Sequence, residues 1–209
     1  MSTIKESTHQ KNVANFDHLI SVLISLGPAY NPGNTSINIT PLQSALTSGQ
    51  NAIDTEKTAK ANWKDLTNTK EIVFSPLSEL STRILHTLES CNVPLPTVHD
   101  CRFYVRKIHG IRAKKIKPAE NENPEQNSND PQDQTPVKHI SVSQRSYDSL
   151  IEHFQRIIVL LSSQPQYATN EPELKISALQ TLLTNMKTAR SNAYTAKAIF
   201  DNARIERNK

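Results

Sequence analysis

The chain contains the same stretch of sequence twice. Residues 20–70 align without a gap on residues 157–207, at a constant offset of 137. The longest identical run, residues 58–61, recurs as residues 195–198 and reads Thr-Ala-Lys-Ala in both places. Such self-similarity indicates a supersecondary unit that is used twice, and it separates positions that serve packing from positions that are free to differ.

The composition predicts that this unit is helical. Only 5% of the 209 residues are aromatic and only four are glycine, whereas strands favour aromatic and β-branched residues and tight β-turns require glycine. We therefore expect an all-α fold, a helical bundle of about six helices in three hairpins, with the first and third hairpins related by the repeat.

Each copy of the repeat is predicted to be a helical hairpin. Apolar residues spaced by three and four indicate a first helix around residues 16–26, and again around residues 147–161. A connection with a conspicuous tyrosine and proline follows, and we expect it to end in a short extended stretch. The second helix of each copy opens with a capping box, Thr40 to Gln43 and Ser177 to Gln180, and continues as a coiled-coil-like, alanine-rich seam.

The middle hairpin, between residues 72 and 117, has no counterpart in the second half. Ser75 and Pro76 are predicted to begin its first helix, and its second helix is expected from about Thr97 to Ile116. By the repeat offset, Lys209 corresponds to Ile72. We therefore expect the first copy to own this hairpin and the second copy to stop where its own would begin, which leaves a groove there.

A polar segment separates the two copies. Residues 118–137 carry five acidic side chains, no basic ones and four prolines, a composition typical of a disordered linker. The predicted domains are a flexible N-terminus (1–12), a first unit of four helices (13–117), a disordered linker (118–140) and a second unit of two helices (141–209). Outside residues 118–137 the chain carries 24 basic and 15 acidic side chains, a net charge of +9.

The apolar segments and the cysteines of the sequence predict its localisation. The N-terminal residues hold no apolar run typical of a signal peptide, and the two cysteines are too few for a disulfide framework. The longest strongly apolar stretch, 157–161, is far shorter than a membrane span requires. We expect a cytoplasmic protein with no membrane partner.

Several segments resemble a family of uncharacterised helical-repeat proteins of bacteria, mainly Bacteroidota. The similar segments are Tyr30-Asn31-Pro32, the stretch from Leu77 to Leu88, the stretch from Gln144 to Ile151, and the end from Ala203 to Asn208. The likeness covers both copies and not the linker. It implies a helical fold and no catalytic residues, because no activity is established for such proteins.

A run of basic residues is the strongest candidate binding site. Residues 102–117 contain seven lysines and arginines and no acidic residue, and on a helix one set falls opposite the apolar side: Arg102, Arg106, Lys107, Lys114 and Lys117. Such a face could contact phosphates without sequence preference. The simpler interpretation is a solvated helix whose C-terminal cations complement its dipole.

No pattern indicates catalysis, a metal or a cofactor. The sequence has no glycine-rich phosphate loop, zinc-protease motif or hydrolase elbow. The group His86, Cys91, His99 and Cys101 matches no standard zinc spacing. Tyr30 and Tyr167 are interpreted as packing residues rather than acids. The function predicted is a non-enzymatic structural or protein–protein interaction module with a protein partner or self-association, the alternative being non-specific nucleic-acid binding through residues 102–117.

Overall fold

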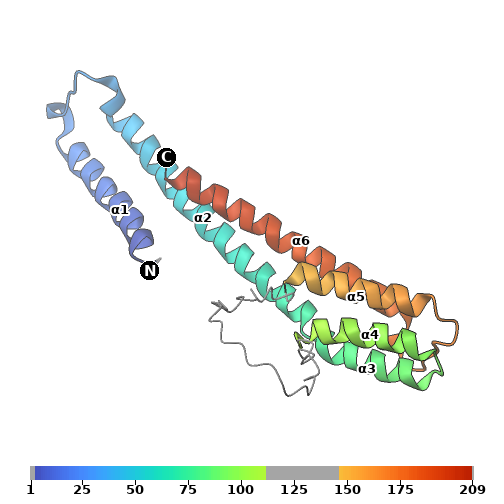
Figure 1. The fold of residues 1–209 in the computed structure, drawn as a ribbon. Helices are drawn as coiled ribbons and strands as arrows, with labels where there is room; N and C mark the ends of the chain where they lie inside the picture. Colours follow the sequence, from blue (N-terminus) through green and yellow to red (C-terminus); the bar gives the residue numbers. More distant parts are fainter. Residues whose placement is uncertain (1–2, 112–145, 209) are drawn as a thin grey trace, which may run out of the picture. The chain divides into compact units, whose positions relative to one another are not determined.

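Figure 1 shows the computed structural model, which describes residues 3–111 and 146–208, with side chains from His9 onward. Every regular element within those ranges is a helix, so the all-α prediction is confirmed. The predicted linker lies outside the described residues. In chain order the elements are α1 (Thr3–Ser25), η1 (Gly27–Ala29), η2 (Thr35–Ile37), α2 (Ile39–Phe74), α3 (Leu77–Ser90), α4 (Leu95–Ile108), α5 (Tyr147–Ser162), η3 (Pro172–Leu174) and α6 (Ile176–Arg207), where η marks a 3-10 turn.

Two compact units contain these helices. One consists of Met1–Ile72 together with Thr188–Lys209, and the other of Val73–Lys187. The long helices α2 and α6 therefore contribute to both. The domain boundaries predicted from the sequence follow chain order, whereas the first of these units combines the start and the end of the chain.

In the unit Val73–Lys187 the middle hairpin covers the second copy of the repeat. Helix α4 packs against both α3 and α5, and α3 also contacts η3. A single apolar core joins these elements to the start of α6, and its fully buried side chains include Leu77, Ile84, Leu88, Cys101, Phe154, Ile157, Leu161, Leu174, Leu179 and Met186. The sequence analysis expects this hairpin to close the first copy, whereas in this unit it packs on the second.

Polar contacts between α3 and η3 are specific to the second copy. The Arg83 guanidinium on α3 donates hydrogen bonds to Glu171 at 2.5 Å and to Glu173 at 2.8 Å, both at η3. These carboxylates raise the pKa of Arg83 above its usual range. The equivalent residues of the first copy are Asn34 and Ser36, which carry no charge. The first copy therefore has no counterpart of this ion pair to offer.

In the other unit, α2 and the last part of α6 pack as an antiparallel pair. Trp63 and Phe200 stack with ring centroids 5.4 Å apart and planes 9° apart. These two residues are 137 apart, so equivalent positions of the two copies meet each other. Ala59 and Ala203 are buried beside these rings and belong to the alanine-rich seams of the two helices.

The two connections share one hydrogen bond. The Tyr30 hydroxyl donates to the Ile37 carbonyl oxygen at 2.6 Å, and the Tyr167 hydroxyl donates to the Leu174 carbonyl oxygen at 2.9 Å. The latter residues stand 137 positions after the former, so the repeat extends to this detail. Each tyrosine thus holds a 3-10 turn, η2 or η3, where the sequence predicted a short extended stretch.

The start of each long helix differs from the prediction. The Leu42 amide donates to the Asn38 carbonyl and the Leu179 amide donates to that of Lys175, so α2 and α6 begin at Ile39 and Ile176. Thr40 and Ser177 are therefore second residues of their helices and not N-caps. Pro41 still fits, because amides of the first helical turn need no intrahelical acceptor.

The ends of the middle hairpin differ as well. Pro76, without a side-chain cap, precedes α3, where the sequence predicted a Ser75 cap. Helix α4 ends at Ile108 and not near Ile116, because Gly110 has a φ of 71° and the Ile111 amide bonds back to the Arg106 carbonyl. This is a Schellman termination, for which glycine is the favoured residue.

Replacing Tyr167 by phenylalanine tests the shared hydrogen bond. Because the Tyr167 ring is half-buried and Leu174 is fully buried, the variant leaves a buried carbonyl without its donor, and we expect a loss of about 1 to 2 kcal/mol in the free energy of unfolding. The matched control is Tyr30→Phe, whose partner Ile37 is exposed, so water can replace the hydroxyl. Denaturant unfolding followed by circular dichroism measures both; equal losses would contradict the interpretation.

Candidate functional site

The first copy carries an apolar face that is accessible to solvent. Ile24 and Ile37 are 50% and 44% exposed, whereas their equivalents in the second copy, Leu161 and Leu174, are fully buried. On α2 the same contrast holds for two half-buried leucines, Leu42 and Leu46, whose equivalents Leu179 and Leu183 are buried. We call Ile24, Ile37, Leu42 and Leu46 the open face.

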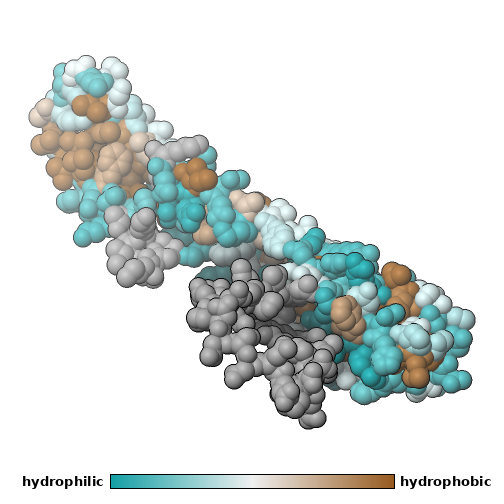
Figure 2. Space-filling model, viewed as in Figure 1, coloured by the Kyte–Doolittle hydropathy of each residue, from teal (hydrophilic) through white to brown (hydrophobic). Residues whose placement is uncertain are grey.

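The cause of this contrast is the middle hairpin. In the unit Val73–Lys187 the residues equivalent to the open face belong to the core shared with α3 and α4. The first copy keeps apolar residues at the same positions but has no such hairpin over them among the described residues of its unit. Figure 2 shows hydrophobic residues gathered over the C-terminal half of α1.

The outward side of α1 is also more apolar than its equivalent on α5. Leu19 and Leu26 are each about half exposed, and the second copy has Arg156 and Ser163 at these positions. Sequence reasoning did not identify this surface. The signal was present, because no charged residue and no histidine occurs between His18 and Asp54.

The predicted basic face is partly used within the protein. The Arg102 guanidinium donates to Glu89 at 2.6 Å and holds the pKa of that carboxyl below its usual range. Lys107 lies over the Phe103 ring, 4.8 Å from its centroid, and Arg106 and Lys107 occupy the last turn of α4. Lys114 and Lys117 lie outside the described residues. Nucleic-acid contact through these five residues stays a prediction.

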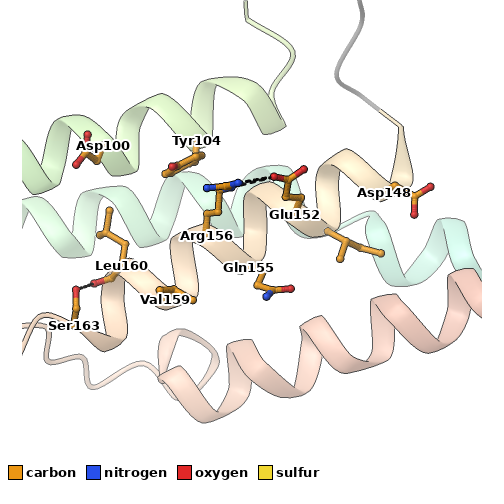
Figure 3. Close-up of a pocket in the computed structure, with 10 residues that line it drawn as sticks. Asp100, Tyr104, Asp148, Glu152, Gln155, Arg156, Val159, Leu160 and Ser163 are labelled. Carbon is orange, nitrogen blue, oxygen red and sulfur yellow. Dashed lines mark hydrogen bonds and ion pairs between the residues drawn. The ribbon is translucent and has the colours of Figure 1, made fainter.

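A shallow groove of about 670 Å³ lies between α4 and α5. Figure 3 shows Arg156 reaching from α5 toward Tyr104 on α4 and toward Glu152 one turn away. The Arg156 guanidinium donates to Glu152 at 2.8 Å, which lowers the pKa of the carboxyl and raises that of the guanidinium. Both side chains are more than half exposed. The groove thus holds a solvated helix ion pair and, among its lining residues, no nucleophile paired with a base.

His153 is the most unusual polar residue beside this groove. Its side chain, on α5, is 94% buried, and the centroid of its ring lies 6.3 Å from that of the Tyr104 ring. Neither ring nitrogen has a hydrogen-bond partner within the described residues. Burial, reinforced by the positive charge of Lys107, lowers its pKa below the usual 6.5. The equivalent residue of the first copy is Phe16, so the position serves packing in both copies.

This histidine predicts a pH-dependent stability. Above about pH 6.5 the His153 ring is neutral in both the folded and the unfolded protein. Below that pH the unfolded chain binds a proton on the ring, whereas burial disfavours the charged ring in the folded protein. The free energy of unfolding therefore falls as the pH falls. Glu152 opposes the effect and Arg156 adds to it. We expect His153→Phe, which installs the first copy's residue, to lose less stability than the wild type between about pH 7.5 and about pH 5.5. Denaturant unfolding at both pH values checks this, with the exposed His86→Phe as control.

The cysteines and histidines considered as metal ligands are buried or make other contacts. Cys101 is fully buried, and burial raises the pKa of its thiol to about 12. The Cys91 thiol donates to the Ala168 carbonyl at 3.3 Å, and His86 lies 3.3 Å from Glu89. Across the described ranges, no three histidine, cysteine or acidic side chains are placed to share a metal ion.

Comparison with known proteins returns no relative: the chain matches no family model, no curated protein and no solved structure. The resemblance to bacterial helical-repeat proteins therefore stays a prediction. No helix within the described ranges has the length and apolar character needed to cross a membrane.

Proposed function

We propose that the protein is a non-enzymatic interaction module, whose helical hairpin α1–α2 binds a protein partner through the open face. One observation carries this proposal: apolar residues of the first copy are exposed at positions where the second copy buries its own under α3 and α4. The second copy thus serves as an internal example of what such a face accepts, which is a pair of amphipathic helices.

The chemistry of the open face supports a protein partner over other classes. Binding to nucleic acid depends on lysine and arginine that neutralise phosphates, and residues 19–53 contain neither. Catalysis would require titratable or nucleophilic side chains held against one another, and the charged residues are absent from this stretch too. Apolar side chains that are exposed together on one face are typical of protein interaction sites.

Hydroxyl-radical labelling of the full chain at high dilution tests the proposal. Ile24 and Ile37 are expected to be oxidised readily, while Leu161 and Leu174 are protected, because only the former are accessible to solvent. A fluorescent apolar dye should bind the diluted wild type and bind less to the double variant Ile24→Glu with Ile37→Glu. Protection of all four residues would refute the proposal.

A further inference from the structure

The open face has one property that selects its partner: it carries no charge. The 35 residues from Leu19 to Ile53 include no aspartate, glutamate, lysine, arginine or histidine. The equivalent residues of the second copy, 156–190, include Arg156, Glu171, Glu173 and Lys175. A partner surface rich in charge would lose hydration on this face without gaining an ion pair.

We infer that the partner of the open face is the open face of a second copy of this chain. A twofold dimer places the same surface against itself, so any charge would meet a like charge near the axis. An uncharged surface has no such penalty. This inference rests on the proposed function, since it names the partner of the same hairpin.

The second copy supplies the geometry of the dimer. There, α5 and the start of α6 are covered by α3 and α4, which makes two hairpins packed across one apolar core. Two α1–α2 hairpins packed through their open faces would build the same arrangement of two hairpins. Ile24, Ile37, Leu42 and Leu46 would then be buried as Leu161, Leu174, Leu179 and Leu183 already are.

The exposed aliphatic residues of the hairpin would form the apolar centre of this interface. A standard interface needs roughly 800 Å² per partner, of which only the centre is strongly apolar. Serine, threonine, asparagine and glutamine of residues 34–51 would supply the uncharged rim.

The chain offers a matched pair of variants. Ile24→Glu with Ile37→Glu introduces charges into the open face, and both positions are exposed enough in the monomer to accept them. Leu19→Arg is the control, because the second copy has Arg156 at the equivalent position and still packs against α3 and α4. The double variant should lose dimerisation, and the control should keep it.

Sedimentation velocity of the full chain at micromolar concentration and on dilution is the test. We expect a wild-type species of twice the 23.4 kDa chain mass, and a dissociation constant raised at least about tenfold in the double variant, with unchanged helical circular dichroism. The single variant Ile37→Glu, in the connection, is used if the double variant loses helix. A dimer that Leu19→Arg breaks and the open-face variants keep would overturn the inference.

A monomeric wild type separates this inference from the proposed function. If the monomer binds apolar dye and its Ile24 and Ile37 are labelled, self-association is refuted while a different protein partner remains the proposal. If the monomer shows neither, both fail. Co-sedimentation of the monomer with neutral phospholipid vesicles would identify a lipid surface as the occupant and also refute self-association.

Discussion

Leu161→Ala is expected to lower the free energy of unfolding by about 2 to 5 kcal/mol, the range for truncating a fully buried leucine. The side chain lies in the core that joins α3, α4, α5 and α6, so its truncation leaves a cavity in that core. Denaturant unfolding followed by circular dichroism measures the loss, and amide hydrogen exchange in α5 locates it.

The control is the equivalent residue of the other copy. Ile24→Ala removes a half-exposed side chain from the same position of the repeat, so at high dilution we expect a loss of at most about 1 kcal/mol. Leu161 and Ile24 occupy equivalent positions of the repeat, and we expect their contributions to the free energy of unfolding to differ several-fold. Losses of similar size would mean that a covering element protects the first copy too.

The sequence predicts where the helices of this fold lie in the chain better than it predicts which helices pack against each other. The three-and-four spacing on residues 147–161 and the seam of α6 follow from the local pattern, and helices form there. The errors at helix ends have local causes: Asn38 and Lys175 accept the first hydrogen bonds, and the αL glycine Gly110 ends α4 earlier than its apolar spacing indicates.

The choice of partner for the middle hairpin could not be read from periodicity. Both copies offer an apolar face at equivalent positions, and chain order favours the first copy. One difference between the copies is the exposed ion pair of Arg83 with Glu171 and Glu173. Because the first copy has Asn34 and Ser36 there, comparison of the copies position by position would have indicated the second copy. The same comparison identifies the open face of the candidate site.

A charged residue in an apolar seam was the second overlooked signal. Glu56 follows Ala52 on the seam of α2, and the second copy has the buried Ala193 at the equivalent position. A carboxylate that is 95% buried requires a partner, since an unpaired buried charge is strongly unfavourable. The partner is Arg207, whose guanidinium donates to the Glu56 carboxylate from the last turn of α6.

Arg207→Ala is therefore expected to cost about 3 to 5 kcal/mol, because it leaves Glu56 buried without its counter-ion. Trp63 lies about two turns further along α2 and is the chain's only tryptophan, so its fluorescence reports unfolding of this unit specifically. The control Arg204→Ala removes an exposed arginine 3.8 Å from Asp201, and exposed pairs contribute at most about 1 kcal/mol. Equal effects of the two variants would contradict a buried ion pair.

Comparison of the two copies also suggests a second substitution that should restore the stability lost in Arg207→Ala. Glu56→Ala installs the residue that the second copy has at this place, and in the background of Arg207→Ala it removes the stranded charge. We expect the double variant to be more stable than Arg207→Ala alone, since the main cost of that variant is the unpaired carboxylate and not a lost attraction. A double variant less stable than Arg207→Ala would mean instead that both side chains act through apolar packing of their stems.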